Sequence, residues 1–189
     1  MASRALQEWR TTQRAELDRL EAAVRASPRA LRPLLVDAYI LLLAGQFQLY
    51  CRRLHDEAVG IVAAHLRPAG TAVILEELGL NRRLDRGNAH AAALSDDFRW
   101  LGSHLWTELV GMDRRNGRRR TRLDQLNVWR NAIAHQALPL REAHAATAAD
   151  TARTLRCARL WRDNCSTLAL QLDRFVKKRL NIMLRIRPW

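Results

Sequence analysis

Apolar residues recur along most of the chain at intervals of three and four, the spacing that places side chains on one face of an α-helix. The first segment shows this recurrence at Leu6, Trp9, Leu17, Leu20 and Val24. It predicts a helix over 3–25, ended by Ser27-Pro28 because a residue before proline disfavours helical geometry. No segment alternates apolar and polar residues as a half-buried strand does.

The second predicted helix covers 31–66, with Pro33 in its first turn, where a missing amide hydrogen leaves no partner unsatisfied. Its middle, A-Y-I-L-L-L-A-G-Q-F-Q-L-Y-C-R-R-L, is apolar on nearly every face. We therefore expect this helix at the centre of a bundle or against another subunit. The sequence R-P-A-G at 67–70 predicts a turn after it.

The rest of the chain predicts shorter helices, a polar loop and a second long helix. One or two helices are expected over 71–110, with a break at 86–88 after which Asn88 caps the following helix. An arginine-rich loop is expected at 111–122. A short helix should run from the T-R-L-D sequence at 121–124 to Leu138, before Pro139, and a final helix should cover 147–180. The fold class is thus an all-α bundle with long central helices, a short helix and a long C-terminal helix. We expect one domain over 1–189, with 1–30 as an N-terminal helical extension.

Composition narrows this picture. The 189 residues are 48% apolar with eight glycines and five prolines, which suits a helical domain with a sizeable core. Three irregularly spaced cysteines predict no disulfide framework and favour a reducing compartment. The start lacks the apolar core of a signal peptide, and the longest apolar stretch, 34–44, is far below the roughly 20 residues that cross a bilayer. We expect a soluble, cytoplasmic protein without membrane partner, metal or cofactor; a zinc site at Cys51 and His55 lacks further ligands.

The charge is large and uneven. The formal net charge is +13, and all basic residues except Lys177 and Lys178 are arginines. Residues 111–189 hold eighteen basic and six acidic side chains, so nearly the whole excess lies there and predicts a polyanion site. The loop at 111–122 contributes six arginines, interpreted either as a solvated connector or as a phosphate-binding arm for RNA: Arg114, Arg115, Arg118, Arg119, Arg120 and Arg122.

The short helix after this loop contains N-V-W-R-N-A-I-A-H-Q, residues 127–136. At about 100° per residue, its polar side chains fall on one side and its apolar side chains on the other. The polar stripe is Asp124, Asn127, Asn131 and His135, and the apolar side is Leu126, Trp129 and Ile133. An arbitrary arginine followed by histidine at this spacing is usually an ordinary surface pair.

Here the match is R-N-A-I-A-H, after a basic segment and before a proline in a helical chain. This combination resembles the HEPN superfamily (higher eukaryote and prokaryote nucleotide-binding). The helix ending F-Q-L-Y-C-R-R-L and the final L-D-R-F-V-K-K-R-L resemble its RiboL-PSP-HEPN branch. The resemblance implies a metal-independent endoribonuclease that works as a homodimer, often a toxin or antiviral defence component, with a neutralising antitoxin or another defence-system partner. Arg130, Asn131 and His135 match the family's functional positions.

The chemistry of these side chains agrees with that expectation. Cleavage without a metal lets the ribose 2′-hydroxyl attack the adjacent phosphorus and leaves a 2′,3′-cyclic phosphate. His135 can act as base or acid near neutral pH, Arg130 can bind phosphate oxygens, and Asn131 can orient the imidazole or donate to the phosphate. One chain supplies one such histidine, so two facing copies would supply both proton-transfer groups.

The competing hypothesis is a non-catalytic helical module of the same fold that binds nucleic acid or a protein partner. It would use Arg130 and His135 only for contact. Tryptophans at Trp100, Trp106, Trp129 and Trp161 fit core or interface positions better than base stacking.

Overall fold

The structure, a computed structural model, describes residues 1–66, 71–72, 76–79, 82–135 and 154–189. These residues contain helices and no strand, which confirms the predicted all-α fold. The turn expected at 67–70 lies outside them. The elements are α1 (Arg4–Glu8), η1 (Trp9–Gln13), α2 (Arg14–Ala26), α3 (Arg32–Ala64), α5 (Arg83–Arg86), α6 (Ala91–Asp97), η2 (Arg99–Leu101), α7 (Leu105–Met112), α8 (Asn116–Ala134) and α9 (Leu155–Leu184).

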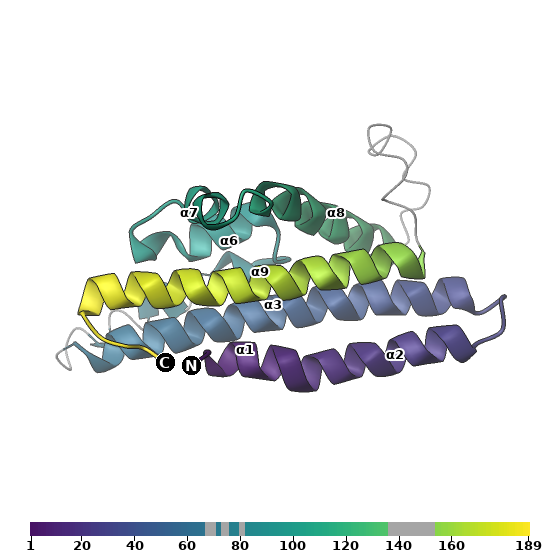
Figure 1. Cartoon of the computed structure of the whole chain (residues 1–189), viewed down its shortest axis with the longest axis horizontal. Coiled ribbons are helices and arrows are strands. Elements are labelled where there is room, and N and C mark those ends of the chain that lie inside the picture. Colours follow the sequence, from purple (N-terminus) through teal and green to yellow (C-terminus); the bar gives the residue numbers. More distant parts are fainter. Residues whose placement is uncertain (67–70, 73–75, 80–81, 136–153) are drawn as a thin grey trace.

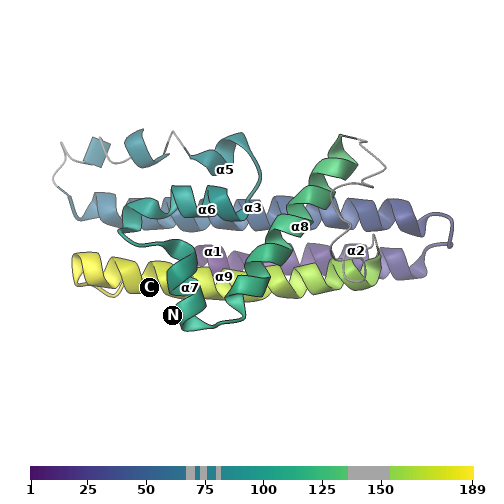
Figure 2. The same ribbon diagram turned by 90° about the horizontal axis from the view of Figure 1, so that it is seen from above.

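The long helices lie side by side, and the shorter ones form a second layer (Figure 1). Helix α3 contacts α1, α2, α8 and α9, so it occupies the centre as its apolar sequence predicts. Helices α3 and α9 run in the same direction, and α2 runs opposite to them. Seen from above, α8 crosses α9 and α3 obliquely, while α5 and α6 follow α3 (Figure 2).

Aromatic rings on α3 form the middle of the core. Phe47 and Tyr50 are buried and surround the buried Trp9, with ring centroids 5.8 and 5.9 Å from it. The Tyr50 hydroxyl donates to the Ala169 carbonyl at 2.7 Å, which joins α3 to α9 and satisfies the one polar atom of this side chain. Burying a large apolar side chain contributes about 1.5–3 kcal/mol, so these rings hold three segments of the chain together.

Among the described residues, α3 is the one helix that is long and apolar enough to cross a membrane by length and composition. This differs from the expectation based on 34–44, because a window of 18 residues averages over single polar positions. Half of that window is buried within the chain. The central helix of a bundle has the same properties, so this finding alone does not identify a membrane segment.

The N-terminal helix is confirmed, but it contains a π-helical turn. Ser3 caps α1 by accepting from the Leu6 amide at 3.0 Å, and α2 ends at Ala26, just before Ser27-Pro28. The wider turn η1 separates α1 from α2. Leu6, Trp9, Leu17 and Val24 are all buried, so this segment belongs to the same core as α3 and α9.

The polar loop predicted at 111–122 is wrong, because only 113–115 interrupts the helices there. Helix α8 begins at Asn116, whose buried side chain donates to the Leu109 carbonyl at 2.6 Å. Asp113 accepts from the Arg115 amide at 3.0 Å and closes the turn. Arginine is itself a good helix former, so the basic sequence continues the helix instead of interrupting it. The helix start predicted at Thr121 is therefore also wrong.

The ends of the last helices differ from the sequence expectations. Helix α8 ends at Ala134, and the predicted stop at Leu138 and Pro139 lies outside the described residues. Helix α9 begins at Leu155, later than predicted, because the Thr154 hydroxyl accepts from the Cys157 amide and caps it. It continues to Leu184, past the predicted end at 180. The chain break at 86–88 is confirmed, but His90, not Asn88, caps α6 by accepting from the Ala93 amide.

One carboxylate joins α2 to α9. Glu21 is 7% exposed, pairs with Arg25, and accepts from Arg159 Nε and Arg162 Nη1 at 2.9 Å each. Burial raises the pKa of Glu21, but Arg162, Arg159 and Arg25 outweigh it, so the pKa is lowered. The carboxylate is thus charged in the fold and pairs with three guanidinium groups.

We predict that Glu21→Gln lowers the free energy of unfolding by about 2 kcal/mol, since removing one partner from a buried ion pair leaves the others uncompensated. Asp18→Asn is the matched control, because Asp18 also binds Arg162 but its side chain is 54% exposed. It should cost less than about 1 kcal/mol. Urea unfolding followed by circular dichroism measures both, and equal losses would contradict the role given to Glu21.

Candidate functional site

The polar stripe predicted on α8 docks this helix onto the segment before α6. Asp124 Oδ1 accepts from the Ala91 amide at 2.8 Å, and Asn127 Nδ2 donates to the Ala89 carbonyl at 3.1 Å. Asn131 Oδ1 accepts from Asn88 Nδ2 at 2.6 Å. Three of the four stripe residues, Asp124, Asn127 and Asn131, thus have structural partners. The fourth, His135, directly follows the last residue of α8.

Arg130, Asn131 and His135 lie at the C-terminal end of α8. Arg130 Nη1 donates to Asn131 Oδ1 at 3.1 Å, so one oxygen accepts from both Arg130 and Asn88. His135 is exposed and follows the last residue of the helix, with its amide bonded to the Asn131 carbonyl at 2.9 Å. No hydrogen bond joins the Arg130 and His135 side chains to each other in the described structure.

The two donors on Asn131 fix the orientation of its amide. Because Oδ1 faces Asn88 and Arg130, the Nδ2 hydrogens of Asn131 point away from them. This end of α8 therefore offers an amide donor, a guanidinium group and an imidazole, and each of them can donate a hydrogen bond to an anion. Asn88 was not identified as a site residue from the sequence; it comes from a segment 43 positions away.

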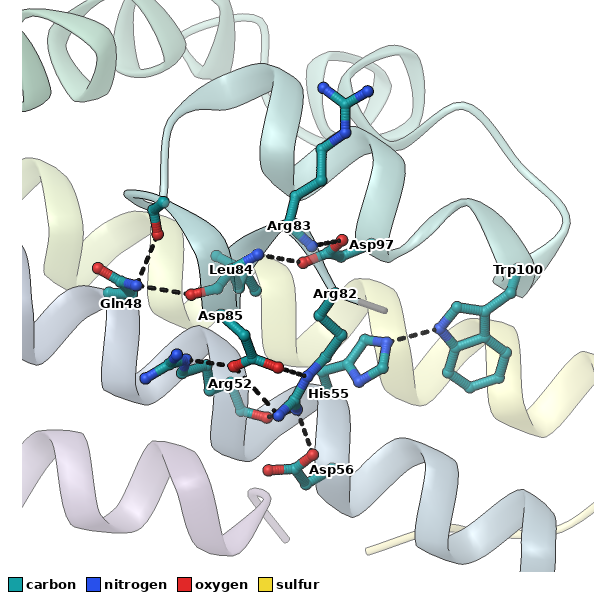
Figure 3. A network of polar contacts seen from close by, with 11 residues as sticks. Gln48, Arg52, His55, Asp56, Arg82, Arg83, Leu84, Asp85, Asp97 and Trp100 are labelled. Atoms are coloured by element: carbon teal, nitrogen blue, oxygen red, sulfur yellow. Dashed lines mark hydrogen bonds and ion pairs between the residues drawn. The ribbon is translucent and has the colours of Figure 1, made fainter. Parts of the chain in front are cut away.

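A polar network holds the segment that carries Asn88 (Figure 3). Asp97 accepts from the backbone amides of Arg83 and Leu84 at 2.8 Å each, which anchors the start of α5 to α6. Gln48 of α3 donates to the Leu84 and Gly87 carbonyls at 2.6 Å each. Arg52 and Arg82 both pair with Asp85, and Arg82 also pairs with Asp56. The residue before Asn88 is thus bonded directly to α3.

His55 lies beneath this network and is 1% exposed. Trp100 Nε1 donates to His55 Nε2 at 3.0 Å, which requires an unprotonated Nε2 and a neutral ring. Burial and, to a smaller extent, the Arg82 charge lower the pKa of His55 to about 4, against smaller raising effects of the Asp97 backbone and Asp85. Such a histidine is a structural acceptor at neutral pH.

The structure divides the six arginines expected to bind RNA. Four of them border a groove of about 270 Å³ between α8 and α9, namely Arg115, Arg118, Arg119 and Arg122. Arg120 lies over the Trp106 ring, 5.7 Å from its centroid, and Arg114 is exposed in the turn before α8. Arg122 and His135 are thirteen residues apart, about 20 Å along the helix. The arginine groove is thus not beside His135 in one chain.

An exposed apolar strip lies on α3. Leu34 is 68% exposed and Leu49 is 37% exposed, with half-buried Leu41 between them. Leu41 lies two turns before Gln48, so it points nearly the same way as the side chain that holds the Asn88 segment. Leu34 and Leu41 therefore lie on the side of α3 from which Gln48 holds the segment before Asn88, and Leu49 lies about 100° round the helix from Gln48.

Within the described part of the chain, no group of three or more histidine, cysteine or acidic side chains is placed to hold a metal ion. Cys51 and His55 are both buried, and the three cysteines are free thiols. Trp106 and Trp161 are buried and Trp100 and Trp129 half-buried, as expected of packing positions.

No protein-family model, curated protein or solved structure matches the chain.

We predict that His55 makes stability fall between pH 6.5 and 4. In this range the unfolded chain binds a proton that the folded chain does not, so the free energy of unfolding falls as the pH falls. With a folded pKa of about 4, the contribution is about 3 kcal/mol. His55→Gln should remove that part of the pH dependence, whereas His65→Gln, at an exposed histidine, should leave it. The free energy of unfolding is measured at pH 6.5 and at pH 4. An equal fall between these two pH values in wild type and His55→Gln would refute this account.

Proposed function

We propose that this protein is a metal-independent endoribonuclease of the HEPN type that works as a homodimer. The observation that carries the proposal is the exposed end of α8, where Arg130, Asn131 and His135 occur together and Asn131 is fixed by Asn88. The three residue types can neutralise, orient and protonate a phosphodiester. The proposal also rests on the sequence resemblance of R-N-A-I-A-H to that superfamily.

In the proposed reaction, the 2′-hydroxyl loses its proton to a base and its oxygen attacks the adjacent phosphorus. The bond from phosphorus to the 5′-oxygen breaks, and an acid protonates that oxygen. The products are a 2′,3′-cyclic phosphate and a 5′-hydroxyl. His135 supplies an imidazole for one proton transfer, and Arg130 with the Asn131 amide stabilises the charge on the nonbridging oxygens. DNA lacks the attacking hydroxyl and is not a substrate.

The two proton transfers need two groups, and one chain supplies one histidine at this end of α8. A second copy related by a two-fold axis would bring its own His135 to the same cleft. The apolar strip of Leu34, Leu41 and Leu49 offers a surface for this association, because exposed leucines at helical spacing gain from being covered. Leu34 and Leu41 lie on the side of α3 from which Gln48 holds Gly87, the residue before Asn88, so an interface there would form on the side of α3 that carries this segment.

The biological role that fits such an enzyme is a toxin or an antiphage defence effector in the cytoplasm. Its RNA-degrading activity would then be controlled by an antitoxin or another component of the defence system. The positively charged surface at 111–122 suits RNA.

We predict that purified protein cleaves total RNA in EDTA and that His135→Ala lowers the rate at least about a hundredfold, the scale of general acid–base catalysis. Arg130→Ala should also reduce the rate sharply, while helix content and oligomeric state stay unchanged. His65→Ala is the control, since His65 is exposed but lies at the C-terminal end of α3, on a different helix from Arg130 and Asn131. Gel analysis of RNA fragments and their cyclic-phosphate ends provides the measurement.

Equal cleavage by wild type and His135→Ala would remove this site from the reaction and indicate a contaminant or another site. RNA binding without cleavage by the wild type would favour the non-catalytic module.

We predict that Leu34→Glu combined with Leu49→Glu gives monomers and abolishes RNA cleavage, because association would remove the two introduced carboxylates from water at a cost in free energy. Ile182→Glu, at an exposed position of α9, should change neither property. Sedimentation analysis gives the oligomeric state, and circular dichroism checks that the variants fold. A monomeric wild type that cleaves RNA would contradict the composite site.

A further inference from the structure

The arginine groove between α8 and α9 is a second basic feature, separate from the end of α8. Arg115, Arg118, Arg119 and Arg122 are spaced by three and four residues, so they project from one side of the helix toward α9. Arg122 and Asn131 are nine residues apart, which places them on opposite sides of α8 at about 100° per residue. A ligand in the groove would thus not contact Asn131 of the same chain.

The groove is built from ordered cations. Arg119 Nη1 donates to Asp113 Oδ2 and to Asn116 Oδ1 at 2.7 Å each, and Arg115 Nε pairs with Asp113 Oδ1 at 3.2 Å. Hydrogen bonds from Arg119 and Arg115 hold the pKa of Asp113 well below its usual range, so the carboxylate stays charged and holds both guanidinium groups. Ordering these side chains in advance lowers the entropy lost when they bind a ligand.

The charge balance of the groove is positive. Among the described residues that line the groove, the one acidic residue is Asp163, whose side chain is 72% exposed and lies 3.8 Å from Arg162 Nε. The described lining thus holds four arginines and one carboxylate, and Asp113 pairs with Arg115 and Arg119 beside it. Arg118 is exposed, and no ion pair or hydrogen bond joins it to another described residue. In contrast, the arginines around Glu21 surround a buried carboxylate.

The shape of the array indicates its ligand. Arg115 and Arg122 are seven residues apart, about 10 Å along the helix, which is the length of about three nucleotides of a stacked strand at 3.4 Å each. Guanidinium groups bind phosphate oxygens in pairs, and a row of them matches a row of phosphodiesters better than one compact anion. We infer that the arginine groove is an exosite that binds the phosphate backbone of an RNA strand, apart from the site where the RNA is cut.

This inference rests partly on the proposed function, which makes RNA the natural polyanion, but it is tested without cleavage. The probe is a fluorescent 20-nucleotide strand of all-2′-O-methyl RNA, which has no free 2′-hydroxyl and cannot be cut. Its dissociation constant is measured by anisotropy as a function of salt. The binding measurement does not depend on cleavage, so a protein without nuclease activity can still bind this strand in the groove. The binding assay therefore tests the exosite, and the cleavage assay tests the nuclease proposal separately.

Arg118→Glu should raise the dissociation constant about tenfold near 0.1 M salt and lower the log–log salt slope by about 0.7 for each phosphate that the protein no longer neutralises. Arg174→Glu is the matched control, because Arg174 is an exposed arginine of α9 outside the groove and the change in net charge is the same. It should change binding less than about twofold. Circular dichroism checks the folding of both variants.

Equal weakening by Arg118→Glu and Arg174→Glu would show binding by overall charge and overturn the exosite. Unchanged binding by Arg118→Glu would overturn it as well. A competition with inorganic diphosphate distinguishes binding of an RNA phosphate backbone from binding of a small phosphate ligand. Displacement of the strand by diphosphate at micromolar concentration would show that the groove takes a compact phosphate ligand and would refute a strand-binding exosite.

Discussion

Covering α3 is the constraint on which the arrangement of the other helices depends. Its side chains are apolar around most of the helix, and burying them requires neighbours on several sides at once. The N-terminal helices, α9 and the shorter helices each cover part of that surface. The strip of Leu34, Leu41 and Leu49 is an apolar part of that surface that stays partly exposed in the described structure.

Helix α8 combines two kinds of docking. Leu123 and Leu126 bury their side chains in the core, while Asp124, Asn127 and Asn131 bond to residues 88–91. The hydrogen bonds are directional, so they set the rotation of the helix as well as its position. That rotation leaves the last turn exposed and faces the arginine groove toward α9. The arginine groove and the end of α8 that carries Asn131 thus lie on opposite sides of this helix and at different positions along it.

The sequence predicted the long helices well because their core positions repeat over many turns. It did not predict the start of α8, since residues 111–122 have little apolar periodicity and the helix there depends on the contacts of Asn116 and Asp113. The contact between Asn88 and Asn131 could not be predicted from the sequence either, because it joins residues far apart in the chain. The motif of Arg130, Asn131 and His135 was found from spacing and resemblance, and its chemistry stays a prediction.

The π-helical turn Trp9–Gln13 shows how one residue can set the register of a whole segment. Trp9, Gln13, Leu17 and Glu21 are all buried at intervals of four, slightly longer than the 3.6 residues of an α-helical turn. A regular helix would let this row drift around its axis, whereas the wider turn keeps it against α3. The turn takes up one extra residue, so Ala5 and Leu6 keep the orientation that fills the core. If the same sequence wound as a regular α-helix throughout, Ala5 and Leu6 would be rotated by about 100°, away from the core they now fill. The wider turn is therefore what lets both halves of this segment present their apolar side chains to α3.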